Sequence, residues 1–302
     1  MANIPPYLKQ GDTIAIVATA RFVTPGQIES SVNLLKEAGF NVEVGKAVFN
    51  ANNQLAGTDK ERADDLQHFI NDDKVKAIFC ARGGYGTIRT IQQVNFSKLS
   101  TNPKWIIGYS DVTVLHSILS NMNIASLHSP MLYKNPDFET SNILNEEVIS
   151  ILKGKKTEYH FNAHPLNFQG RAQGKLVGGN LSVLYSLRGT PYDLQTSDCI
   201  LFIEDVDEYL YHIDRMMMNL KSSKMLSKLR GIIVGDMTDM HDNQIPFGKN
   251  AYEIIAEHVE DLCIPVCYGF PAGHGQVNKP LVLGHKVKLD IGAKCSLTMT
   301  GR

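Results

Sequence analysis

The chain has 302 residues, of which 43% are hydrophobic and 20% are charged, a balance that is typical of a globular protein. Its formal net charge of −1 gives neither the basic surface of a nucleic-acid-binding protein nor a strong acidic field, so we expect no nucleic acid partner. No apolar run approaches the roughly 18 residues that a membrane helix requires, and the first residues show no secretory signal. We therefore expect a cytoplasmic protein without a membrane partner.

The first half of the chain alternates short apolar segments with helical patterns. Thr24 and Pro25 suit the start of one helix, and Gly39 is placed to end it. Because strands and helices alternate, we predict an α/β fold with a parallel, doubly wound sheet. The predicted strands are 13–19, 41–48, 75–81 and 104–108, and the predicted helices include 24–40, 58–72 and 111–123.

The pattern loosens over residues 134–170, where one helix is predicted at 145–153. We place a domain boundary in this region, which divides the chain into an N-terminal domain, 1–160, and a C-terminal domain, 161–302. The second half again mixes strands with helices, but its last segment, 281–300, follows a strand–turn–strand pattern. This predicts a second α/β domain with a mixed sheet.

A single serine stands at the junction of a predicted strand and a predicted helix, in "KWIIGYSDVT" (104–113). The carboxyl edge of a parallel sheet is where ligands bind, and the free N–H groups at a helix start, including that of Asp111, suit a developing anion. The pattern is G-x-S-x-V, which differs from the G-x-S-x-G of a nucleophile elbow in its fifth residue. Ser110 is therefore either a nucleophile or only the N-cap of the helix.

A nucleophilic serine needs a base and a group that orients the base. Among ten histidines, His274 is distinctive because glycines flank it in "GFPAGHGQVNKP" (269–280) and allow a close approach to another group. Glu204 follows a buried strand and can hold the imidazole in one tautomer. The alternatives are an exposed turn histidine and an acid that caps a helix.

The segment "CARGGYGTIRT" (80–90) leads from a predicted strand through a glycine-rich loop into a helix. The backbone N–H groups of such a loop, around Gly83 and Gly84, can form the second wall of an anion site. Arg82 is a candidate for binding a substrate carboxylate, with a surface salt bridge as the alternative. The loop lacks the spacing of a dinucleotide fingerprint, and no metal-ligand spacing is present, so we expect no cofactor and no metal.

Together these segments resemble the LD-carboxypeptidase family of serine peptidases, which includes muramoyltetrapeptide carboxypeptidases and microcin C immunity proteins. The resemblance covers nearly the whole chain and implies a Rossmann-like N-terminal domain, a smaller C-terminal α/β domain, a site between them and a homodimer. It rests on "GDTIAIVATA", "ARGGYGTIR", "IIGYSDVTVLH", "GGNLSVL", "FIEDVDEYLYHIDRMM" and "GFPAGHG".

Carried onto this sequence, the resemblance implies that Ser110 is the nucleophile, His274 the general base and Glu204 the group that orients it. The amides of Asp111 and of the Gly83–Gly84 region would form the oxyanion hole. The implied reaction releases the terminal D-alanine from a cytoplasmic murein tetrapeptide, through an acyl-enzyme, in peptidoglycan recycling.

Two other functions stay open at this point. An immunity-type peptidase would cleave an aminoacyl-nucleotide amide with the same triad. No aromatic-rich loop for stacking a nucleobase is evident, and Trp105 lies in a predicted buried strand, which favours the murein peptide. A two-lobed ligand-binding protein is the non-enzymatic alternative, and the coincidence of the three triad residues argues against it.

Overall fold

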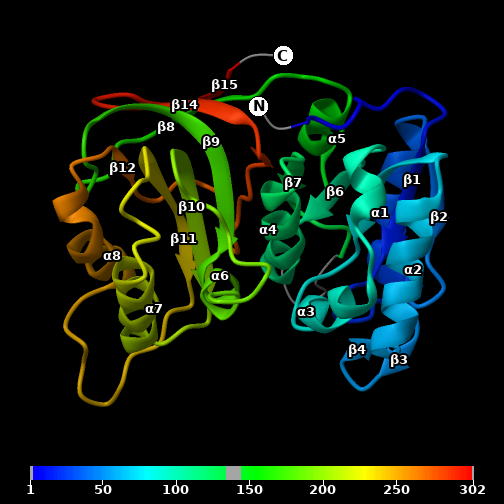
Figure 1. The fold of residues 1–302 in the computed structure, drawn as a ribbon, viewed down its shortest axis with the longest axis horizontal. Coiled ribbons are helices and arrows are strands. Elements are labelled where there is room, and N and C mark those ends of the chain that lie inside the picture. The colour runs from blue at the N-terminus through cyan, green and yellow to red at the C-terminus, as the bar shows by residue number, and fades with distance from the viewer. Residues whose placement is uncertain (1–2, 134–143, 301–302) are drawn as a thin grey trace.

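The computed structural model describes residues 3–133 and 144–300. Two α/β halves, each built on one main sheet, lie side by side, and α4 (Thr113–Asn121) packs between them against strands of both sheets (Figure 1). The predicted α/β class is confirmed, with a mostly parallel first sheet and a mixed second sheet. Part of the segment in which the sequence pattern loosens, 134–143, lies outside the described residues.

The first sheet has six strands, of which all but β13 run parallel. Buried apolar clusters cover both of its faces, which explains why its central strands are continuous apolar runs in the sequence. From edge to edge the strands are β13 (Leu281–Leu283), β7 (Ser126–His128), β6 (Trp105–Gly108), β5 (Val75–Cys80), β1 (Thr13–Val17) and β2 (Asn41–Val44).

The helices of this half begin and end close to the predicted positions. Thr24 forms a capping box with Gln27 at the start of α1, and Gly39 follows the helix with φ +92°. Besides α4 the helices are α1 (Pro25–Glu37), α2 (Asp59–Asn71), α3 (Thr87–Thr90) and α5 (Glu146–Leu152), and a small hairpin pairs β3 (Ala51–Asn52) with β4 (Leu55–Ala56).

The second sheet has seven strands, parallel on one side and antiparallel on the other. In order they are β12 (Val266–Cys267), β11 (Gly231–Thr238), β10 (Cys199–Val206), β9 (Gly170–Asn180), β14 (Lys286–Ile291), β15 (Cys295–Met299) and β8 (Glu158–Phe161). The helices α6 (Leu181–Ser186), α7 (Leu210–Ser222) and α8 (Ala251–Val259) follow its parallel strands. No helix within the described ranges is long and apolar enough to cross a membrane.

The strand β13 joins the two halves, because it comes from the end of the chain but pairs in the first sheet. On β7, His128 pairs in parallel with Gly108 of β6 and antiparallel with Leu281 of β13. The chain therefore enters β13 at the same sheet edge at which β6 ends. A division of the chain at residue 160 assigns β13 to the C-terminal domain, although β13 pairs in the first sheet. The boundary between 160 and 161 stays a prediction.

Candidate active site

Ser110 occupies a tight turn directly after β6. Its φ of +62° lies in the left-handed region, which costs a residue with a side chain roughly 1–2 kcal/mol. A 3-10 helix, Ser110–Val112, leads from this turn into α4. The N-caps of these two helices are Tyr109 and Val112, so Ser110 caps neither of them. The turn has the strained strand–turn–helix form of a nucleophile elbow.

The valine that replaces the fifth glycine of the elbow motif is accommodated by the first glycine. A Cβ on Gly108 would lie 2.9 Å from Cγ2 of Val112, and Gly108 has φ +151°. The side chain of Val112 is fully buried. A methyl group of Val112 therefore fills the space that a side chain at position 108 would need.

The glycine-rich loop lies against the serine, as the sequence predicts. A Cβ on Gly83 would be 3.2 Å from Oγ of Ser110. The buried carboxylate of Asp111 accepts a 2.8 Å hydrogen bond from the N–H of Thr87, the first residue of α3. Burial raises the pKa of Asp111, although its hydrogen bonds with Thr87 oppose this rise. The side chain of Asp111 thus ties the serine turn to the loop, while the proposed role of its backbone amide stays a prediction.

Arg82 lies beside this loop with its guanidinium stacked over the ring of Tyr133, 4.0 Å from the centroid. Burial lowers the pKa of Arg82, and neighbouring Arg21 acts in the same direction. Arg82 forms no ion pair within residues 3–133 and 144–300, so the surface salt bridge is not observed there. A Cβ on Gly84 would lie 2.7 Å from Cδ of Arg21, which places a second guanidinium at the loop.

His274 and Glu204 are in direct contact, as predicted. The Nδ1 atom of His274 lies 2.7 Å from Oε2 of Glu204, which stands on β10 and is fully buried. Gly273 has φ +133°, and a Cβ there would lie 2.9 Å from the same oxygen, so the glycine is needed for this approach. Glu204 caps no helix, since α7 has Tyr209 as its N-cap.

The environment of His274 favours the imidazolium form. Burial lowers the pKa of His274, but the charge and hydrogen bond of Glu204, together with Asp205 and Asp236, outweigh burial and raise it above the ordinary value. Because Nδ1 faces a carboxylate, it carries the proton of the neutral ring, and Nε2 is left with the lone pair of a base. A group of this kind can accept a proton and hold the resulting charge.

The topology of the sheets brings His274 and Ser110 to one edge. The ring of Tyr109, the residue before Ser110, lies 4.8 Å from the ring of His274 between centroids. The loop that contains His274 enters β13, which is two strands away from β6. The Ser110 hydroxyl makes no hydrogen bond with His274 in the described part of the chain, so the complete triad stays a prediction that this proximity supports.

Two family models match most of the chain. The model of the LD-carboxypeptidase N-terminal domain matches residues 14–129, and that of the LD-carboxypeptidase C-terminal domain matches residues 173–289. The chain belongs to the LD-carboxypeptidase family. The resemblance read from the motifs is confirmed, and the protein is a serine-type carboxypeptidase.

Individual relatives of this LD-carboxypeptidase carry two kinds of name. It is 35% identical to the "Probable murein peptide carboxypeptidase" of Bacillus subtilis, over 98% of this chain and 94% of the relative. It is 26% identical to the "Microcin C7 self-immunity protein MccF" of Escherichia coli, over 95% of this chain and 93% of the relative. The crystal structure of muramoyltetrapeptide carboxypeptidase from Oxalobacter formigenes superposes with a TM-score of 0.84 and 26% identity, over 96% of this chain and 99% of that one.

The second glycine turn of the LD-carboxypeptidase, "VGGNLSVL" (177–184), has a structural role. A Cβ on Gly178 would lie 1.8 Å from the carbonyl oxygen of Phe202, so only glycine lets β9 approach β10 here. Asn180 caps α6 and donates a 2.8 Å hydrogen bond to Asp205. Burial and nearby Glu204 raise the pKa of Asp205 to about 7.

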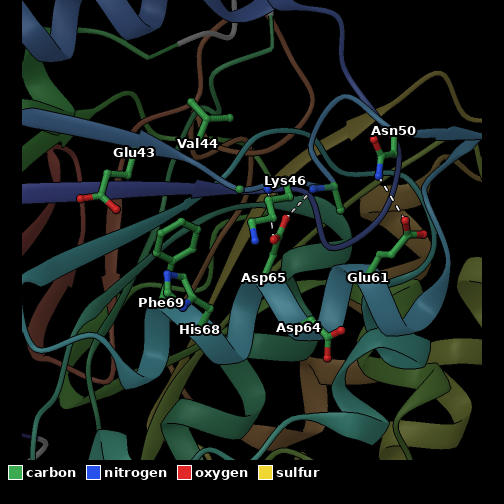
Figure 2. A pocket seen from close by; sticks show the side chains of 11 residues that line it. Glu43, Val44, Lys46, Asn50, Glu61, Asp64, Asp65, His68 and Phe69 are labelled. Carbon is green, nitrogen blue, oxygen red and sulfur yellow. Dashed lines mark hydrogen bonds between the residues drawn. The ribbon is translucent and has the colours of Figure 1, made fainter.

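A pocket of about 510 Å³ lies between β2 and α2, and it contains none of the predicted site residues (Figure 2). Two of its acidic side chains, Asp65 and Glu61, are engaged in local hydrogen bonds. Asp65 accepts from the amides of Lys46 and Ala47, and Glu61 accepts from Asn50. Over residues 3–133 and 144–300, no group of His, Cys, Asp and Glu side chains could hold a metal ion.

Proposed function

We propose that this enzyme hydrolyses the L,D-peptide bond that releases terminal D-alanine from cytoplasmic murein tetrapeptides. The contact between His274 and the buried carboxylate of Glu204, at the sheet edge where Ser110 sits in a strained turn, carries this proposal. The names of the relative from Bacillus subtilis and of the structure from Oxalobacter formigenes support the choice of a murein peptide.

In the proposed reaction, Oγ of Ser110 attacks the carbonyl carbon of the third stem residue. Nε2 of His274 takes the hydroxyl proton, and the carboxylate of Glu204 stabilises the imidazolium. The amides of Asp111 and of the Gly83–Gly84 region bind the tetrahedral oxyanion, and losing one such donor typically raises the barrier by about 2.7–4 kcal/mol. The intermediate collapses when His274 protonates the amine of D-alanine, and a water activated by His274 then hydrolyses the acyl-enzyme.

The carboxylate of D-alanine requires a cation, and we assign it to Arg82 with Arg21 as its neighbour. Both guanidiniums lie at the glycine loop that contacts Ser110, and that of Arg82 stacks over the ring of Tyr133. A planar guanidinium binds a carboxylate through two parallel hydrogen bonds. The pair would therefore select peptides that end one residue beyond the attacked carbonyl.

A second candidate is cleavage of an aminoacyl-nucleotide amide, because one relative is named a microcin C7 self-immunity protein. Trp105 is fully buried and its indole N–H donates to the carbonyl of Pro6, so this ring is not available to a nucleobase. Tyr85, in the glycine loop, is 53% exposed and is the aromatic side chain there that a base could stack on. The murein peptide remains our preferred substrate.

The deciding experiment is incubation with purified murein tetrapeptide, followed by mass spectrometry for the loss of one alanine. Murein pentapeptide tests the length preference, an aminoacyl-adenylate amide tests the second candidate, and Ser110→Ala is the inactive control. Failure of the wild-type enzyme to release alanine, or unchanged release by Ser110→Ala, would refute the proposal.

We also propose that the enzyme is a homodimer. Light scattering after size-exclusion chromatography measures the mass in solution and tests this directly.

A further inference from the structure

One residue of β11 holds the loop that carries His274 on both sides of the imidazole. The backbone N–H of Asp236 donates a 2.9 Å hydrogen bond to the carbonyl of Ala272. The carboxylate of Asp236 accepts a 3.2 Å hydrogen bond from the N–H of Gly275. Since β11 lies beside β10, the strand of Glu204, the loop and its carboxylate partner are fixed to neighbouring strands.

The loop fits closely on this strand. A Cβ on Gly235 would lie 2.3 Å from the carbonyl oxygen of Ala272, and a Cβ on Gly275 would lie 2.6 Å from Oδ2 of Asp236. A real Cβ does not come this close to another heavy atom. Gly235 is therefore needed for the backbone carbonyl of Ala272 to approach β11, and a side chain at position 275 would push against the carboxylate of Asp236. Two contacts therefore fix the position of His274. The end of β11 holds the main chain of its loop, and Glu204 on β10 holds its imidazole.

Asp236 also contributes charge to the surroundings of His274. Burial raises the pKa of Asp236 to about 6, while its hydrogen bond from Gly275 and nearby His274 oppose this rise. In its charged form Asp236 helps to raise the pKa of His274. The groups that face His274 are Glu204 and Asp205 on β10, Asp236 on β11, Tyr109 after β6, and His128 on β7. Burial keeps the pKa of His128 well below its usual value, so His128 adds no positive charge near neutral pH.

We propose that Asp236 is a positioning residue of this carboxypeptidase, whose carboxylate fixes the main chain beside His274 and whose charge favours the protonated imidazole. This inference rests on the proposed function, in which His274 is the base. Asp236 touches neither the serine nor the attacked bond in that mechanism. Its effect on turnover passes through the geometry and basicity of His274.

Two substitutions separate these effects. Asp236→Asn keeps an acceptor oxygen for Gly275 but removes the charge, so we expect kcat to change by less than about threefold while the acid limb of kcat/KM moves down by about one pH unit. Asp236→Ala also removes the acceptor, and we expect kcat to fall at least about tenfold with little change in KM. Asp239→Asn, at an exposed acid three residues further along the chain, is the matched control and should leave both quantities unchanged.

The inference is wrong if Asp236→Asn leaves the acid limb in place, or if Asp239→Asn shifts it equally. If the Asp236→Ala variant does not fold, the acid limb of kcat/KM in Asp236→Asn still tests the inference. An NMR titration of the His274 ring, assigned with His274→Gln, tests Asp236 even if the enzyme does not cleave murein tetrapeptide. A lower imidazole pKa in Asp236→Asn supports the inference, and an unchanged value overturns it.

Discussion

Replacing Glu204 by glutamine tests the electrostatic part of the proposed triad. The Glu204 side chain is fully buried, and its Oε2 lies 2.7 Å from Nδ1 of His274. Glutamine has nearly the same shape and keeps one acceptor oxygen, so the substitution removes the charge and little else. Without that charge, the imidazolium that forms during attack loses its main stabilising partner.

The expected size of the effect follows from Coulomb's law. Two unit charges about 4 Å apart attract each other by roughly 4 kcal/mol at an effective dielectric constant of 20. Since roughly 1.4 kcal/mol corresponds to a tenfold change in rate, kcat should fall by about a thousandfold. The other carboxylate oxygen, Oε1, is buried and has no hydrogen-bond partner among residues 3–133 and 144–300, so the charge is incompletely compensated there. The free energy of unfolding should therefore stay the same or rise in Glu204→Gln.

The assay measures kcat for alanine release together with thermal unfolding. Asp214→Asn is the matched control, because Asp214 accepts a 2.8 Å hydrogen bond from His258 between α7 and α8, in a pair outside the candidate triad. We expect this control to keep kcat within about threefold of the wild type. A Glu204→Gln enzyme that retains more than about a tenth of wild-type kcat would refute the reasoning, as would an equal loss in Asp214→Asn.

Three further outcomes are expected. Ser110→Gly should abolish turnover. Because glycine adopts the left-handed backbone at φ +62° without strain, the same variant should raise the free energy of unfolding by about 0.5–1 kcal/mol. A lower free energy of unfolding in urea denaturation would show that Ser110 is not strained. Arg82→Met should lower kcat/KM for the tetrapeptide by about 10- to 150-fold, through a lost charge-assisted hydrogen bond worth about 1.5–3 kcal/mol. The same variant should affect a C-terminally amidated tetrapeptide much less, and equal losses on both peptides would exclude Arg82 as the carboxylate ligand. Because His274 must be neutral to act as a base and its pKa is raised, the acid limb of kcat/KM should have its midpoint above 6.5, and a lower midpoint would count against His274.

The sequence predicted the features that a single segment controls. The strands β1, β5 and β6 could be read as apolar runs because both faces of the sheet are covered. Glu204 and His274 could each be singled out by a local signal, an acid near a strand end and a histidine between glycines. The structure brings these two residues, 70 positions apart, into contact. The matching family models confirm that these segments, taken in order, identified the family.

Several residues at the site gave weaker signals. Arg21 follows the first buried strand, and its place at the sheet edge could have indicated a second cation at the glycine loop. Asp236 lies near the end of β11, but nothing in its own segment shows that it binds the loop around His274. The carboxylate of Asp111 accepts a hydrogen bond from Thr87, 24 positions earlier in the chain, and a contact between separate segments leaves no signal in either one.

By itself the sequence indicated which segments are strands and helices, where the serine turn falls and which side chains are candidates for acyl transfer. Only the tertiary structure decided that β13, a three-residue strand near the end of the chain, pairs with β7 in the first sheet. Burial and backbone geometry act within a segment and leave a readable pattern, whereas pairing across more than 150 residues depends on which sheet edge is free when the chain collapses. That pairing carries the His274 loop from the second sheet to the edge where Ser110 lies, and so brings together the two halves of the candidate site.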